Sequence, residues 1–120
     1  MIVIYYYGYG TKWLESKKPI KVYELKVFYL VDDIPFFPTK ETGIWFSSDA
    51  FEYSVRPNDV LWNQKEKYVE VSFEADHIED LSFEKQNEIF SDMIDGGWKE
   101  CSDEDKYDID VISEYNKQRG

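Results

Sequence analysis

The stretch "IKVYELKVFYLV", residues 20–31, is the clearest strand in the sequence, and the predicted fold is built around it. Successive residues of a strand point to opposite faces, so the odd-numbered positions share one face. That face consists of Tyr23, Leu25, Val27, Tyr29 and Val31. Phe28 and Leu30 make the opposite face apolar near the end of the strand. A strand that is apolar on both faces is typical of the centre of a sheet or of a position under a helix.

The segment before this strand, "MIVIYYY" at residues 1–7, is predicted to be its partner in a hairpin. Its β-branched and aromatic side chains are typical of a strand. Gly8 and Gly10 are expected to end it, because glycine is uncommon inside strands. Residues 11–19 are then expected to form a long loop that connects the two strands.

Shorter strands are expected in the middle of the chain, after a loop at residues 32–43 that contains two prolines. Ser48 is expected to cap a short helical turn after the first of these strands. In the last strand apolar residues alternate with polar ones, and the turn before it reads "NQKEK". The expected strands are residues 44–46, 60–62 and 68–75, and the inward positions of the last are Val69, Val71, Phe73 and Ala75.

A helix is predicted from Ser82 to about Asp95. Serine is a good N-cap residue, and apolar residues then recur at helical spacing. Gly96 and Gly97 follow directly. This pair is a strong stop signal, because glycine adopts the left-handed cap conformation at little cost.

A second helix is expected over residues 103–117. Ser102 with Asp105 has the spacing of a capping box. The supporting apolar spacing comes from Tyr107, Val111 and Tyr115. A strand is the alternative for the start of this segment, because Tyr107, Ile109 and Val111 also alternate.

The order of these elements, strands first and helices last, predicts an α+β fold. The chain has 120 residues, of which 42% are hydrophobic and 18% aromatic, and this size suits one domain with a real core. We expect a single domain over residues 1–120. Its antiparallel sheet would have about four or five strands, with two C-terminal helices on one face.

Negative charge is concentrated in one part of the chain. The formal net charge is -11. The window from Glu66 to Glu114 holds seventeen acids and four lysines, which gives a net charge of -13. Nucleic acid and anionic membranes carry the same sign of charge, so neither is expected to bind this region. A basic protein surface is the favoured partner.

The sequence offers little for catalysis or metal binding. Cys101 is the sole cysteine and His77 the sole histidine, so a transition-metal site with several N or S ligands is not expected. Nothing in the sequence orients the two as a thiol–imidazole pair. We therefore expect no catalytic residue, no metal, no cofactor and no enzyme activity. An acid–base or metal role for His77 is the less favoured alternative.

The cysteine content and apolar segments also predict location. A single cysteine fits a reducing compartment. The apolar run at residues 1–7 is much shorter than a membrane span of about 20 residues, and it lacks the basic start of a signal peptide. We expect a cytoplasmic protein, located in the host cytoplasm if a phage encodes it.

The run "DGGWKECSDEDKYDID", residues 95–110, combines seven carboxylates with interleaved aromatic residues. A run of this kind is commonly no more than a solvated face, and that alternative stays open. Aromatic anchors within a charged rim are, however, typical of tight protein interfaces. The predicted partner-binding residues are Trp98, Glu100, Asp103, Glu104, Asp105, Tyr107, Asp108 and Asp110.

Residues 87–110, "NEIFSDMIDGGWKECSDEDKYDID", contain a predicted helix, then a Gly-Trp pair, then an acidic cluster. This order resembles the C-terminal part of a small acidic anti-CRISPR protein that inhibits a type II Cas9. In that family the acidic cluster occupies the site that reads the duplex beside the target. The resemblance implies the same role for the carboxylates of Asp103, Glu104, Asp105 and Asp108. In size, acidity and aromatic content the chain is equally similar to immunity proteins of nuclease toxins.

These features together predict a non-enzymatic inhibitor that binds a basic cleft of a nuclease or another nucleic-acid-binding protein. It would contact neither nucleic acid nor membrane directly. A phage anti-defence protein and an immunity protein against a bacterial nuclease toxin fit equally well. A structural or accessory homo-oligomer, with residues 1–7 at the subunit contact, is the alternative from a different class. The oligomeric state itself is not predicted.

Overall fold

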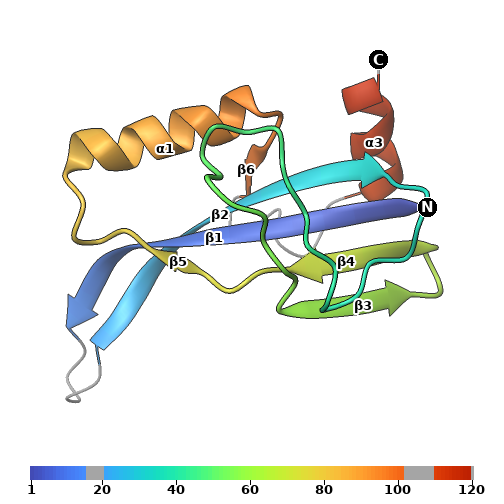
Figure 1. Cartoon of the computed structure of the whole chain (residues 1–120), viewed down its shortest axis with the longest axis horizontal. Coiled ribbons are helices and arrows are strands. Elements are labelled where there is room, and N and C mark those ends of the chain that lie inside the picture. Colours follow the sequence, from blue (N-terminus) through green and yellow to red (C-terminus); the bar gives the residue numbers. More distant parts are fainter. Residues whose placement is uncertain (16–20, 102–109, 120) are drawn as a thin grey trace.

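A long β-hairpin forms the centre of the molecule (Figure 1). The structure is a computed structural model that describes residues 1–15, 21–101 and 110–119. The hairpin consists of β1 (Ile2–Glu15) and β2 (Lys21–Asp33), which pair antiparallel from one end to the other. The predicted central strand and its hairpin partner are therefore confirmed.

β1 is longer than predicted, because Gly8 and Gly10 lie inside the strand. Gly8 is opposite Val27 of β2, and Gly10 is opposite Leu25. Continuous pairing with β2 therefore outweighs the weak strand preference of glycine at these positions. The ladder shifts register only between Gly10 and Lys12.

The sheet is mixed, with the strand order β3-β4-β1-β2-β6 and with β5 also beside β1. The four further strands are β3 (Asp59–Asn63), β4 (Tyr68–Ser72), β5 (Asp76–His77) and β6 (Lys99–Cys101). The β3–β4 hairpin is antiparallel as predicted, but β1 pairs parallel with β4 and with β5. This departs from the antiparallel sheet that was expected. The parallel pairs join segments far apart in sequence, so no local turn reveals them.

β1 is a central strand with both faces covered. Val3 and Ile4, which point to opposite faces, are both fully buried. β2 lies along one edge of β1, and β4 and β5 lie along the other. Both edges of this strand are therefore paired within the chain, and Met1, at 44% exposed, is the most accessible residue of the 1–7 segment.

The two helices, α1 (Phe83–Asp95) and α3 (Val111–Arg119), lie on opposite faces of the sheet. Met93 of α1 belongs to the cluster on one face, and Val111 of α3 belongs to the cluster on the other. The prediction of both helices on one face is thus corrected. The physical reason is that β1 and β2 carry apolar side chains on both faces, and each face needs a cover.

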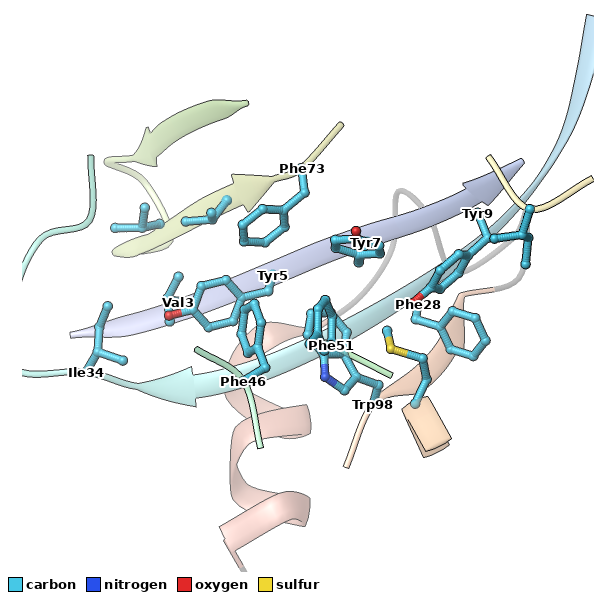
Figure 2. Close-up of a cluster of buried hydrophobic side chains, with 14 residues drawn as sticks. Val3, Tyr5, Tyr7, Tyr9, Phe28, Ile34, Phe46, Phe51, Phe73 and Trp98 are labelled. Carbon is cyan, nitrogen blue, oxygen red and sulfur yellow. The ribbon is translucent and has the colours of Figure 1, made fainter. Parts of the chain in front are cut away.

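The core on the α1 side is mostly aromatic (Figure 2). Alternate side chains of β1 point into it and meet rings from the following loops and from the segment after α1. The labelled members are Val3, Tyr5, Tyr7, Tyr9, Phe28, Ile34, Phe46, Phe51, Phe73 and Trp98. Each aromatic ring buries roughly 150–250 Å², so this cluster supplies much of the hydrophobic stabilisation of so small a domain.

The ends of α1 follow the prediction. The Ser82 hydroxyl oxygen accepts a hydrogen bond from the backbone N–H of Lys85 at 3.2 Å. Gly96 is the C-cap, and Gly97 has a φ of 92°, which is unfavourable for other residues. Both cap assignments are therefore confirmed.

α3 begins at Val111, and Asp110 caps it. The Asp110 carboxylate accepts a hydrogen bond from the backbone N–H of Ser113 at 3.0 Å. The Asp110 backbone carbonyl oxygen accepts one from the backbone N–H of Glu114 at 2.9 Å. The helix prediction is confirmed from Val111 onward. Its first part, with the Ser102 cap, lies outside the described residues.

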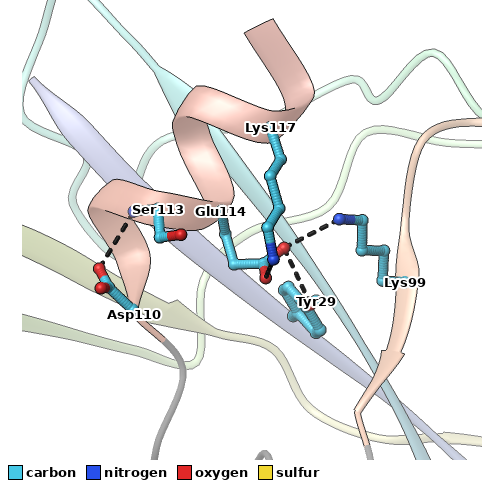
Figure 3. A network of polar contacts seen from close by, with 6 residues as sticks. All are labelled: Tyr29, Lys99, Asp110, Ser113, Glu114 and Lys117. Carbon is cyan, nitrogen blue, oxygen red and sulfur yellow. Dashed lines mark hydrogen bonds and ion pairs between the residues drawn. The ribbon is translucent and has the colours of Figure 1, made fainter. Parts of the chain in front are cut away.

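A polar network holds α3 against the sheet (Figure 3). The Glu114 carboxylate accepts from Lys99 of β6 at 2.8 Å and from the Tyr29 hydroxyl of β2 at 3.2 Å. Lys117 lies 3.4 Å away on the next turn. The hydrogen bond from Lys99 is the main cause that lowers the pKa of Glu114, so this carboxylate stays charged.

The long connection between β2 and β3 contains little regular structure. The predicted strand at residues 44–46 is reduced to a single bridge between Ile44 and Val55. The predicted helical turn is instead a tight turn in which the Ser48 carbonyl accepts from Phe51 at 3.1 Å. The Ser48 hydroxyl accepts from Ala50 at 3.2 Å. Ser48 thus organises the turn as a local acceptor, as predicted, without starting a helix.

Candidate acidic groove

The residues predicted to bind a partner are only partly described by the structure. Trp98, Glu100 and Asp110 are described. The remaining predicted contacts lie outside the described residues: Asp103, Glu104, Asp105, Tyr107 and Asp108.

Trp98 is a core residue and not a surface anchor. It is 2% exposed, and its ring packs against Phe46 and Phe51 with centroid distances of 5.0 Å and 5.8 Å (Figure 2). The prediction for Trp98 is therefore wrong. Tryptophan is common both in interfaces and in cores, and its charged neighbours in sequence do not show which way the ring turns.

Glu100 and Asp110 are exposed, but each has a structural role. Glu100 of β6 lies 3.4 Å from Lys26, whose ammonium group also sits 4.5 Å from the centre of the Phe90 ring. Asp110 caps α3 on the other face of the sheet. These two carboxylates therefore do not form one patch.

A different set of carboxylates does converge. A groove of about 460 Å³ lies between the 49–55 loop, β5 and α1, and we call it the acidic groove. Five carboxylates line it, together with a single lysine, Lys85. The acids are Asp49, Glu52, Asp76, Glu88 and Asp92. Tyr53, which is 73% exposed, also lines the groove and offers an accessible ring.

The α1 wall of the groove follows from helical spacing. Glu84, Glu88 and Asp92 are four residues apart, so they lie along one face of the helix. Glu88 and Asp92 line the groove, and Glu84 lies one turn further along the same face. This spacing is visible in the sequence, but the predicted site lay in the longer acidic run at residues 95–110.

The loop wall is fixed to α1 by Ser48. Its hydroxyl donates to the backbone carbonyl of Asp92 at 2.8 Å. Phe51 from the same loop is buried against Trp98, at 5.8 Å, and against Tyr7, at 4.9 Å between centroids. With these anchors in place, the intervening polar side chains face solvent. Trp98 thus packs in the core against Phe51, which lines the groove.

Asp76 lies near the β1 side of the groove. The Tyr7 hydroxyl donates to its carboxylate at 3.5 Å. Burial, with the Asp76 charge as the next cause, raises the pKa of Tyr7 to about 12. Tyr7 is therefore a neutral hydrogen-bond donor at physiological pH.

Gly96 is required by the close approach of the Ser48 turn. A Cβ at position 96 would lie 2.5 Å from the Ser48 Cβ and 3.0 Å from its Cα. We expect Gly96→Ala to lower the free energy of unfolding by about 1–3 kcal/mol, because neither neighbouring atom is on a flexible chain end. Urea unfolding measures this cost.

Gly43→Ala is the matched control for Gly96→Ala. A Cβ at position 43 would meet nothing closer than the Ser54 Oγ at 3.7 Å. Its unfolding free energy is expected to stay within about 0.5 kcal/mol of the original. Equal unfolding curves for the two variants would contradict the contact between Gly96 and Ser48.

His77 and Cys101 are not brought together. His77 pairs beside Gly10 of β1, and Cys101 pairs beside Val27 of β2, so both central strands separate them. Strands lie about 4.8 Å apart, which puts the two backbones roughly 14 Å from each other. His77 instead lies 3.7 Å from the Glu79 carboxylate. Within the described residues, no group of three or more His, Cys, Asp or Glu side chains is arranged to hold a metal ion.

Comparison with known proteins adds no relative. No family model matches the chain, and neither a curated protein nor a solved structure is significantly similar to it. In the described part of the chain, no helix has the length and apolar character needed to cross a membrane. The acidic groove is therefore the feature that carries the functional proposal.

Proposed function

We propose that this protein is a non-enzymatic inhibitor that binds a basic cleft of a nuclease or another nucleic-acid-binding protein. The observation that carries the proposal is the acidic groove, in which carboxylates from the 49–55 loop, β5 and α1 line one concave surface. Lysine and arginine side chains of a partner are the groups that such a surface complements.

Repulsion among the groove carboxylates lowers the stability of the fold, and this cost supports a binding role for them. Like charges four residues apart destabilise a helix by about 0.2–0.5 kcal/mol per pair, and α1 carries Glu84, Glu88 and Asp92 at that spacing. Lys85 lies 3.6 Å from the Glu88 carboxylate and offsets part of this repulsion, whereas Asp49, Glu52 and Asp76 add three further negative charges to the groove lining. A basic partner offsets this repulsion on binding.

The groove also has an exposed aromatic ring that is suited to anchoring a partner. Tyr53 is largely exposed beside the carboxylates, although burial of its ring would be favourable. Tyrosine is enriched among residues that dominate binding energy at interfaces. The partner's cationic side chains would enter the groove, and an apolar or cationic group of the partner would cover the Tyr53 ring.

Inhibition would follow from competition for the partner's phosphate-binding surface. Acidic surfaces accelerate association with basic clefts at low salt, toward about 10⁸–10⁹ M⁻¹s⁻¹. Carboxylates would then occupy positions meant for phosphates. Glu100 and Asp110 lie outside the groove and keep the structural contacts described above, so the proposal rests on the groove carboxylates.

Phage anti-defence and toxin immunity both remain versions of this proposal. The first requires a partner such as Cas9, and the second requires a nuclease toxin. The groove complements a basic cleft of either kind, so the choice between them depends on which enzyme is inhibited.

The test is inhibition of purified nucleases, with Cas9 and a set of bacterial nuclease toxins as the panel. We expect stoichiometric inhibition of DNA cleavage by one member, with an apparent affinity that falls as salt rises. A groove variant with Asp49→Asn, Glu52→Gln and Glu88→Gln is expected to bind at least about tenfold more weakly. The measurement is a titration of cleavage activity and of direct binding.

The matched control neutralises Glu24, Glu41 and Glu66, which are exposed elsewhere and change the net charge equally. It should inhibit almost as well as the original. Salt-independent inhibition, or equal effects of the two triple variants, would contradict a role for the groove. If Asp103→Ala, Glu104→Ala and Asp105→Ala together abolish inhibition while the groove variant retains it, the contact surface is the acidic run instead.

A further inference from the structure

β3 is the last strand at one edge of the sheet, and its outer side is open among the described residues (Figure 1). The Asn63 carbonyl accepts from Lys67 in the β3–β4 turn at 2.8 Å, so Asn63 faces β4. The Val60 N–H donates to the Asp59 side chain at 3.1 Å. Alternate residues of an antiparallel strand face opposite edges, so the backbone groups of Val60 and Trp62 point outward.

This edge carries exposed apolar side chains. Leu61 is 54% exposed and Trp62 is 46% exposed. Phe37 from the preceding loop lies beside Trp62, with ring centroids 6.3 Å apart. Edge strands are commonly protected by lysine, proline or a bulge, and the sequence "DVLWN" of β3 contains neither lysine nor proline.

The strand is complementary to a second copy of itself. In an antiparallel pair centred on Leu61, that residue faces Leu61 of the other copy and Val60 faces Trp62. Asp59 then faces Asn63, so no two like charges are opposite each other. Val60 and Trp62, whose backbone groups point outward, become the hydrogen-bonded pairs in this register.

The residues just beyond the strand ends are also compatible with this register. Arg56 precedes β3 and Glu66 follows it. Antiparallel pairing brings the Arg56 end of one copy toward the 64–67 turn of the other, where Glu66 lies between Lys65 and Lys67. A two-fold symmetric contact repeats this approach on both sides, so the pairing depends on the strand itself and not on these flanking charges.

We propose that two copies of this chain pair through β3 and form one continuous sheet across a two-fold axis. The second copy is the occupant because the register satisfies both backbones, places apolar residues opposite each other and keeps like charges apart. The net charge of -11 on each copy opposes association. Salt screens that repulsion, so the dimer strengthens as salt rises. This trend is opposite to the one expected for binding to a basic partner, and the two proposals stand or fall separately.

Sedimentation equilibrium of the full chain, over a wide range of concentration and salt, measures the dimer directly. We expect the mass to rise from 14.4 kDa toward twice that value as concentration increases. Leu61→Lys places two like charges opposite each other on the axis and is expected to raise the dimer Kd by more than about tenfold. Leu61→Glu should do the same.

Ile94→Lys is the matched control. Ile94 is 51% exposed on α1, so the variant has the same new side chain and the same net charge as Leu61→Lys. It should dimerise normally. Mixing the Leu61→Lys and Leu61→Glu variants should restore a dimer, because opposite charges then meet on the axis. A protein that stays monomeric at high salt, or a dimer that Leu61→Lys leaves unchanged, overturns the proposal.

Discussion

Trp98→Ala is expected to lower the free energy of unfolding by about 3–5 kcal/mol, a large share of the stability of a small domain. The ring is almost fully buried and touches four other rings. Its neighbours are Tyr5, Tyr7, Phe46 and Phe51, at centroid distances of 5.0–6.5 Å. Alanine would leave a cavity between the sheet and the loop that carries Asp49 and Glu52.

Urea unfolding followed by circular dichroism measures this loss, with Trp45→Ala as the control. Trp45 is 69% exposed, so its removal should change stability by less than about 0.5 kcal/mol. Trp98→Phe should retain much of the stability, because an aromatic ring fills part of the space. If Trp98→Ala proves as stable as Trp45→Ala, Trp98 is not a core residue, and its role as a surface anchor becomes tenable again.

The elements of this fold that local patterns specify were predictable. The alternation in residues 20–31 identified β2, and Ser82 with the Gly96-Gly97 pair identified the ends of α1. In each case the decisive interaction joins residues close in sequence. Side-chain caps and short turns are determined by such neighbours.

The arrangement of these elements was harder to predict. Parallel pairing of β1 with β4 joins two hairpins across more than fifty residues, and no turn motif encodes it. The placement of the helices on opposite faces was nevertheless accessible. Phe28 and Tyr29 are apolar neighbours on opposite faces of β2, and both faces of such a strand must be covered.

The candidate site, too, could be predicted only where it depends on residues close in sequence. The sequence correctly located excess negative charge after Glu66, but charge adjacent in sequence is not charge adjacent in space. The acidic groove draws Asp49 and Asp76 from segments that meet only through the packing of Phe51 and the Ser48 contact to α1. Only the α1 wall of the groove could be recognised from the sequence, because its acids are four residues apart. The ring of Trp98 was assigned to the surface because its inward orientation depends on the position of β6 in the sheet.

The domain is expected to unfold at alkaline pH, between about pH 10 and pH 12, because β1 buries several tyrosines. Burial raises the pKa of Tyr5 and of Tyr7 from 10.0 to about 12. Burial also raises the pKa of Tyr6 and Tyr9, with the Glu70 charge and the neighbouring Tyr7 as the next causes. Each hydroxyl is thus held neutral in the folded state.

The direction of the effect follows from proton linkage. Below pH 10 these tyrosines are protonated in both states, so their packing contributes fully to stability. Between pH 10 and pH 12 the unfolded chain releases protons that the folded chain retains, so the free energy of unfolding falls as pH rises. Circular dichroism at increasing pH records the transition, and the part of the phenolate absorbance that comes from Tyr5 and Tyr7 should rise with it.

A double variant with Tyr5→Phe and Tyr7→Phe separates this mechanism from general alkaline damage. Phenylalanine cannot ionise, so the variant's stability should fall less steeply with pH even if its stability at neutral pH differs. Tyr53→Phe, at an exposed position beside the groove, should leave the transition where it was. The difference in phenolate absorbance between the original protein and the double variant isolates Tyr5 and Tyr7. If that difference rises near pH 10, before any loss of structure, these hydroxyls reach solvent and the β1 core is looser than the packing in Figure 2.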